Sequence, residues 1–159
     1  MNEQMITKWF NFYGLIFMIL ILLPNIVFAV THKDGFENLY RNKFVEVAEP
    51  IGRFGCFICM FVSIPLPIGL PIGGFWFDGA RLVYIICGSL ISTAYVIGWI
   101  VFRKTNSVFK SLYLSIVPSL LFVECGVFTL NIPLIMFCAV FAPCHILISY
   151  KNAKTLNKE

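Results

Sequence analysis

An acidic residue, Glu124, stands inside an apolar run that extends over residues 112–150. A charged side chain at the centre of a bilayer costs about 3 kcal/mol on insertion scales, so Glu124 should be buried or paired. The carboxyl group is then either a binding site for a proton or cation, or a structural hydrogen-bond acceptor for a neighbouring helix. Asp78 and Arg81 precede another apolar run and are candidate partners for Glu124.

Segment 63–74 contains three prolines and three glycines in twelve residues. Proline in a helix interior removes a hydrogen bond and clashes with the preceding turn, so a regular helix cannot continue through this segment. Two interpretations remain open. The segment is either a broken membrane span whose unwound backbone lines a protected binding site, or an outer interfacial loop that follows a span with an earlier start. The first interpretation adds four residues to the candidate ligand- or ion-binding set: Pro65, Pro67, Gly69 and Pro71.

Four residues could form a metal or redox site. Cys56 and Cys59 are three apart, which places both thiols on one helical face. Cys144 and His145 lie at a similar depth in the last apolar run. Three thiols and one imidazole suit a soft metal ion, and two thiols suit redox chemistry. The alternative is that these cysteines only pack as small apolar residues, and no particular cofactor is indicated.

The composition places these residues in an all-α integral membrane helical bundle, formed by a single transmembrane domain, 1–159. Hydrophobic residues make up 59% of the chain and charged residues 13%, whereas soluble domains have about 25% charged residues. About 20 apolar residues cross a bilayer as a helix. The apolar runs predict five spans, of which the second is broken by proline and glycine: 9–30, 54–72, 82–102, 111–130 and 132–150.

The distribution of lysine and arginine favours five spans over four. Cytoplasmic loops carry an excess of these residues. With five spans and an outer N-terminus, two basic residues, Lys8 and Arg81, lie outside and ten lie inside. With four spans, in which 112–150 crosses once, the distribution becomes 5 against 7. The sequence therefore predicts a cell-membrane protein with its N-terminus outside and its C-terminus in the cytoplasm.

Two spacings predict local contacts. Glu49 and Arg53 are four residues apart, so they can form an ion pair on an interfacial helix over 42–53. The third span, 82–102, carries small residues four apart, which allow neighbouring helices to approach closely. These pairs are Gly88 with Ser92, Ser89 with Thr93, and Ala94 with Gly98. We expect this span to be the central packing helix, with dimerisation as an alternative use of its small residues.

Two stretches, Ile51-Gly-Arg-Phe-Gly-Cys56 and Phe141-Ala-Pro-Cys-His-Ile146, resemble uncharacterised small multi-pass membrane proteins of low-GC Gram-positive bacteria. The resemblance covers most of the chain. It implies a location in the bacterial plasma membrane and no known activity.

The functional prediction is binding or transport of a small molecule or ion, carried by Glu124 and the Pro/Gly segment. The alternative is a non-enzymatic accessory, regulatory or immunity protein that binds a partner within the membrane. A metal or thiol-redox enzyme is a third reading. The sequence contains no phosphate-binding glycine loop, no HExxH and no GxSxG motif, which favours a protein that is not an enzyme. Expected partners are the lipid bilayer and a membrane protein or second copy of the chain, and no nucleic acid.

Overall fold

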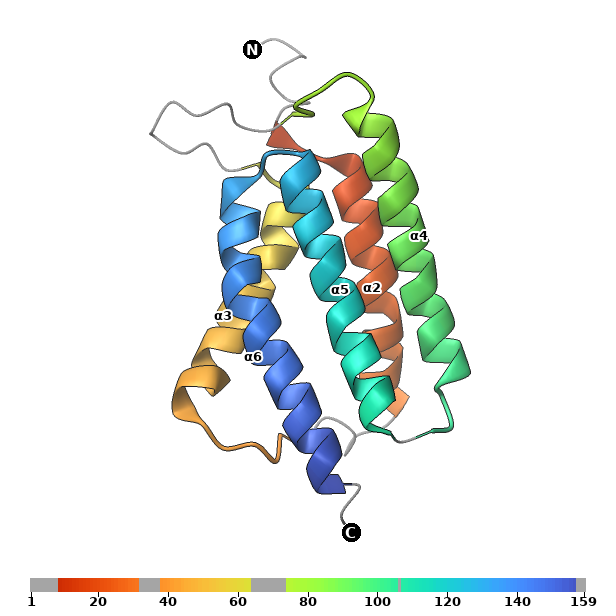
Figure 1. The fold of residues 1–159 in the computed structure, drawn as a ribbon, viewed down its shortest axis with the longest axis vertical. Coiled ribbons are helices and arrows are strands. Elements are labelled where there is room, and N and C mark those ends of the chain that lie inside the picture. The colour runs from red at the N-terminus through yellow and green to blue at the C-terminus, as the bar shows by residue number, and fades with distance from the viewer. Residues whose placement is uncertain (1–8, 32–37, 64–73, 106, 157–159) are drawn as a thin grey trace.

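A computed structural model describes residues 9–31, 38–63, 74–105 and 107–156. Apart from an isolated bridge between Phe10 and Val62, every regular element in these ranges is a helix. The five helices are α2 (Phe12–Thr31), α3 (Lys43–Phe61), α4 (Ala80–Val101), α5 (Val108–Phe128) and α6 (Ile132–Leu156). Successive helices run in opposite directions along the long axis of one bundle (Figure 1). We call the end where α2 begins the upper end, and the end where α6 finishes the lower end.

Four helices are long and apolar enough to cross a membrane: α2, α4, α5 and α6. They confirm four of the predicted spans, at 9–30, 82–102, 111–130 and 132–150, and the chain has the character of a multi-pass membrane protein. The last helix continues beyond the predicted end to Leu156. Large apolar side chains stay exposed along these helices, as expected where lipid rather than water covers the surface.

The helix found where the second span was predicted has different bounds from the prediction. Helix α3 begins at Lys43, well before the predicted start at residue 54, and ends at Phe61. The predicted interfacial helix over 42–53 is therefore the first half of α3. Helix α3 is not among the four helices that are apolar enough to cross a membrane, because it carries the charged residues Lys43, Glu46, Glu49 and Arg53. The Pro/Gly segment from residue 64 to residue 73 lies outside the described residues.

The predicted break within 112–150 is confirmed. Helix α5 ends at Phe128 and α6 begins at Ile132, and Leu130 between them has a positive φ of 48°. The side chain of Asn131 accepts a hydrogen bond from the backbone N–H of Leu134 at 3.2 Å. Its Nδ2 atom donates to the carbonyl of Cys59 at 2.7 Å. Asn131 therefore caps α6 and also satisfies a carbonyl group near the upper end of α3.

Helices α3 and α6 pack at very short range. A Cβ atom added at Gly52 would lie 2.8 Å from the backbone nitrogen of Phe141, and one added at Gly55 would overlap the ring of Phe137. Real Cβ atoms do not make contacts this short, so glycine at these positions permits the close approach. The stretches 51–56 and 141–146 are thereby brought against each other.

The central helix is α5, not the third span as predicted. Over the most apolar 18 residues of each helix, 44% of the residues of α5 are buried inside the bundle, compared with 28% of those of α4. Small residues on α4 do accommodate neighbours, because Gly88 receives the ring of Phe17 and Gly98 receives the ring of Tyr113. Helix α4 uses them to contact α2 and α5 from the edge of the bundle, which leaves its opposite face exposed.

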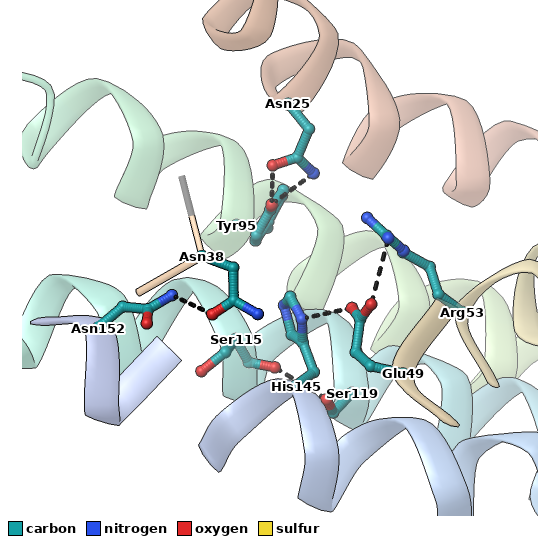
Figure 2. A network of polar contacts seen from close by, with 9 residues as sticks. All are labelled: Asn25, Asn38, Glu49, Arg53, Tyr95, Ser115, Ser119, His145 and Asn152. Atoms are coloured by element: carbon teal, nitrogen blue, oxygen red, sulfur yellow. Dashed lines mark hydrogen bonds and ion pairs between the residues drawn. The ribbon is translucent and has the colours of Figure 1, made fainter. Parts of the chain in front are cut away.

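Polar side chains also connect helices inside the bundle (Figure 2). The amide of Asn25 on α2 exchanges hydrogen bonds of 2.8 and 3.1 Å with the hydroxyl group of Tyr95 on α4. Near the lower end, Asn152 on α6 donates to Asn38 at 3.2 Å and accepts from the backbone of Tyr40 at 3.0 Å. These contacts hold the segment that leads into α3 against α6.

Candidate functional site

Glu124 lies on α5, one helical turn from the upper end of the bundle, and is 8% exposed. One carboxyl oxygen, Oε2, accepts a weak hydrogen bond from the thiol of Cys125 at 3.5 Å. The other oxygen, Oε1, is inaccessible to solvent and has no hydrogen-bond partner among the described residues. A buried carboxyl group without a partner is costly and usually indicates a bound ligand, ion or proton. Glu124 is therefore the strongest candidate for a binding residue.

One aromatic residue, Tyr84, lies beside Glu124 and belongs to a cluster of packed rings. Tyr84 on α4 is fully buried and lies beside both Cys125 and Glu124. Its hydroxyl group accepts a hydrogen bond of 2.9 Å from Asn11 at the start of α2. The rings of Phe17 and Phe75 each pack on Tyr84 with centroids 5.5 Å away. Helices α2, α4 and α5 thus all contribute to the surroundings of Glu124.

The other residues predicted for this site are not brought to Glu124 in the described part of the chain. The guanidinium group of Arg81 donates to the hydroxyl of Tyr13 at 2.7 Å and lies 5.3 Å above that ring. Asp78 is exposed at the upper end. Pro65, Pro67, Gly69 and Pro71 lie outside the described residues.

A second polar site, which we call the Glu49 cluster, consists of Glu49, Arg53 and His145. Figure 2 shows Glu49 on α3 between Arg53 on the same helix and His145 on α6. Oε2 of Glu49 lies 3.2 Å from a terminal guanidinium nitrogen of Arg53, and Oε1 lies 3.0 Å from Nδ1 of His145. Only 8% of the Glu49 side chain is exposed, compared with 41% for Arg53 and 28% for His145.

Local structure fixes the geometry of the Glu49 cluster. Asn42 caps α3 by accepting from the backbone N–H groups of Phe44 and Val45, which sets the helical phase that turns Glu49 inward. The imidazole of His145 stacks on Phe141 with centroids 4.7 Å apart. Both carboxyl oxygens of Glu49 are engaged in this contact between α3 and α6, whereas Oε1 of Glu124 has no partner in the described residues.

The four predicted metal or redox residues do not form one site in the described residues. Cys56 and Cys59 are both buried on the inner face of α3, as their spacing predicts, but Cys56 lies next to Cys138. His145 instead contacts Glu49. All six cysteines are free thiols, and within the described ranges no three His, Cys, Asp or Glu side chains are placed to hold a metal ion.

Sequence reasoning missed the contact between Glu49 and His145. The Glu49–Arg53 ion pair was expected and is present, but His145 was grouped with the cysteines. The feature of the sequence that could have predicted this contact is the distribution of apolar and charged residues around α3. Its large apolar residues recur every three or four positions on one exposed face, and Glu49 lies off that face, among small residues that turn toward the bundle. The exposed apolar residues are Phe44, Val47, Ile51, Phe54 and Ile58.

Comparisons with protein-family models, curated proteins and solved structures found no match for this chain. The resemblance to bacterial membrane proteins, and the location in a bacterial plasma membrane that it implies, gain no support from these comparisons. The functional argument therefore rests on the residues and their geometry.

Proposed function

We propose that this chain is a multi-pass membrane protein that binds a small molecule or an ion at Glu124, in connection with its transport. The observation that carries the proposal is the buried carboxyl oxygen of Glu124, which has no hydrogen-bond partner in the described residues. A purely structural glutamate on a membrane helix would be expected to have both oxygens satisfied, as Glu49 does. A cation or a polar ligand at Oε1 would supply the missing partner.

The proposal includes α3 as a fifth membrane span. The exposed face of α3 is apolar from Phe44 to Ile58, and its most buried charge, Glu49, is paired within the bundle. A helix of this kind can face lipid on one side and protein on the other, although its average hydropathy is low. Its antiparallel position beside α6 (Figure 1) supports the same topology.

The orientation follows from the basic residues. Among the described residues, the loops and helix ends at the lower end carry seven, and the upper end carries only Arg81. An excess of lysine and arginine marks the cytoplasmic side, so the lower end is assigned to the cytoplasm and Glu124 to the outer half of the bundle. The seven are Arg41, Lys43, Arg103, Lys104, Lys110, Lys151 and Lys154.

Substitution Glu124→Gln tests the binding proposal. We expect at least one cation in a panel of Na⁺, K⁺, Ca²⁺, small amines and quaternary ammonium ions to raise the melting temperature of the purified protein in detergent. At saturating ligand the rise should be about 5–10 °C, and Glu124→Gln should abolish it. Without ligand, Glu124→Gln should be at least as stable as the wild type, because it removes an unpaired buried carboxyl group.

Asp78→Asn is the matched control, since it removes an exposed acid from the same end of the bundle. This variant should respond to the cation as the wild type does. A panel without any stabilising cation, or one that stabilises Glu124→Gln equally, would show that Glu124 is not a binding residue. A large loss of stability in Glu124→Gln would instead indicate a structural hydrogen bond.

The alternative function, binding of a membrane partner, is supported by the outer face of α4. Ser89 and Thr93 are four apart and exposed there, and small polar residues on a lipid-facing surface favour contacts between helices. Photo-crosslinking from position 89 in native membranes should capture a defined partner or a second copy if this alternative holds. Capture of lipid alone would count against it.

A further inference from the structure

The groups near Glu124 are poor in free oxygen ligands. The hydroxyl group of Thr129 donates to the carbonyl of Cys125 at 2.6 Å. The phenol oxygen of Tyr84 already accepts from Asn11. Calcium takes six to eight oxygen ligands and magnesium a near-ideal octahedron. Apart from the carboxyl group of Glu124, these two neutral hydroxyl groups are the side-chain oxygens found near it in the described residues, which is fewer than a hard metal ion requires.

The same surroundings are rich in aromatic rings. Phe17 and Phe75 pack on Tyr84, which lies beside Glu124. Phe128, one turn after Glu124 on the same helix, pairs with Phe77 at 6.3 Å. Aromatic faces attract organic cations, above all ammonium groups with apolar substituents. A buried carboxylate with an aromatic cluster beside it, here Tyr84 with Phe17 and Phe75 packed on its ring, suits such a cation.

The segment that carries Phe75 and Phe77 packs against the rings near Glu124. It is bounded by Gly74 and Gly79, both with positive φ and with open space where a side chain would stand. One long backbone hydrogen bond, from the N–H of Gly74 to the carbonyl of Thr129 at 3.3 Å, ties it to the end of α5. In the described residues, this hydrogen bond and the ring contacts of Phe75 with Tyr84 and of Phe77 with Phe128 hold the segment against the bundle.

We propose that the ligand of Glu124 is an organic monocation, an amine or quaternary ammonium with an apolar body, which the carboxylate pairs with and the rings of Phe75 and Tyr84 contact. This inference rests on the proposed binding function and names its substrate class. A neutral molecule could not pair with the charge of the carboxylate. A small inorganic ion could not use the apolar and cation–π contacts of the rings.

The test uses benzyltrimethylammonium as the probe and neopentylbenzene, in which carbon replaces the charged nitrogen, as its neutral isostere. Equilibrium binding to the full chain in detergent should be measurable for the ammonium and at least about 30-fold weaker for the isostere, as expected when one partner of a buried charge pair is lost. Glu124→Gln should weaken ammonium binding by a similar factor, and Asp78→Asn should leave it unchanged.

A second pair of variants keeps the charge and tests the rings. Phe75→Leu should weaken ammonium binding by about 3- to 30-fold, the range of a cation–π contact. Phe10→Leu, which alters an exposed ring at the same end, should have no effect. This pair remains informative if Glu124→Gln fails to fold.

The outcomes separate this inference from the proposed function. If Na⁺ or another inorganic cation binds in a Glu124-dependent manner and the ammonium does not, the substrate class is wrong and the binding function stands. If the isostere binds as tightly as the ammonium, or if Phe75→Leu behaves like Phe10→Leu, the inference is also wrong. If no cation of either class binds the wild type, both proposals fail.

Discussion

Glu49 is held by an arginine and a histidine from two helices, and this double contact explains how an acid can lie inside an apolar bundle. Arg53 reaches it along α3, and His145 reaches it from α6. Two charge-assisted contacts offset part of the desolvation cost that a lone carboxylate would carry. Glu124 lacks this support on Oε1 in the described residues, which is why we propose it as the binding residue.

The substitution Glu49→Gln should lower the free energy of unfolding by about 2 kcal/mol, because an amide cannot replace the carboxylate for both Arg53 and His145. Chemical or thermal unfolding in detergent measures this loss. Glu46→Gln is the matched control on the same helix, and it should change stability by about 0.5 kcal/mol or less. Equal effects of the two substitutions would show that the Glu49 cluster does not contribute to stability.

At the scale of elements, α3 is the helix whose two faces have opposite character. Its inner face follows the spacing of Val45, Glu49, Gly52, Cys56 and Cys59, and it combines small residues with one paired charge. The outer face carries large apolar residues. The helix therefore depends on α6 for its polar contacts, and the short approach at Gly52 is what brings Glu49 and His145 within hydrogen-bond distance.

Gly52→Ala tests this dependence. The added methyl group meets the backbone of Phe141, which cannot rotate away, so α3 and α6 must separate. We expect a loss of about 1–3 kcal/mol in unfolding free energy despite the higher helix propensity of alanine.

Gly55→Ala serves as the comparison, because its methyl group meets only the ring of Phe137, and this half-buried side chain can move. The loss should be smaller than at Gly52. If the loss at Gly55 equals or exceeds the loss at Gly52, the backbone of Phe141 is not what limits the approach of α3 to α6.

For the whole molecule, the alternating direction of five helices places the start of α2 and the end of α6 at opposite ends of the bundle (Figure 1). The basic residues of the described chain gather at the lower end, close to the ends of α2 and α6 and the start of α3. If α3 crosses the membrane, the loops on its two sides face opposite compartments. If it does not, they face the same one.

Cysteine labelling in intact cells distinguishes these topologies. A membrane-impermeant maleimide should modify Asp78→Cys from outside. It should modify Leu39→Cys and Thr105→Cys only after permeabilisation, because both lie at the lower, basic end. Mass spectrometry of the labelled peptide reads each position separately from the native cysteines. Modification of Leu39→Cys and Asp78→Cys from the same side would refute the fifth span.

Sequence by itself determined the parts of this protein that depend on local composition. Runs of about 20 apolar residues predict helices that cross a bilayer, and four such helices are present. The break at Asn131 was predictable because asparagine caps helices and proline suits a first turn. The Glu49–Arg53 pair was predictable because residues four apart on a helix are neighbours.

Other features depended on how the helices pack, and only the tertiary structure decided them. The sequence left open whether the second span starts at residue 54 or earlier, because charged residues hide the apolar outer face of α3 from an average over the segment, and the structure shows one helix from Lys43. Cys56 and His145 were expected to meet, but α6 is positioned so that Cys56 meets Cys138 and His145 meets Glu49. The physical reason is that a helix fixes only which of its own residues share a face, whereas the close approach at Gly52 fixes which residue of the next helix stands opposite each of them.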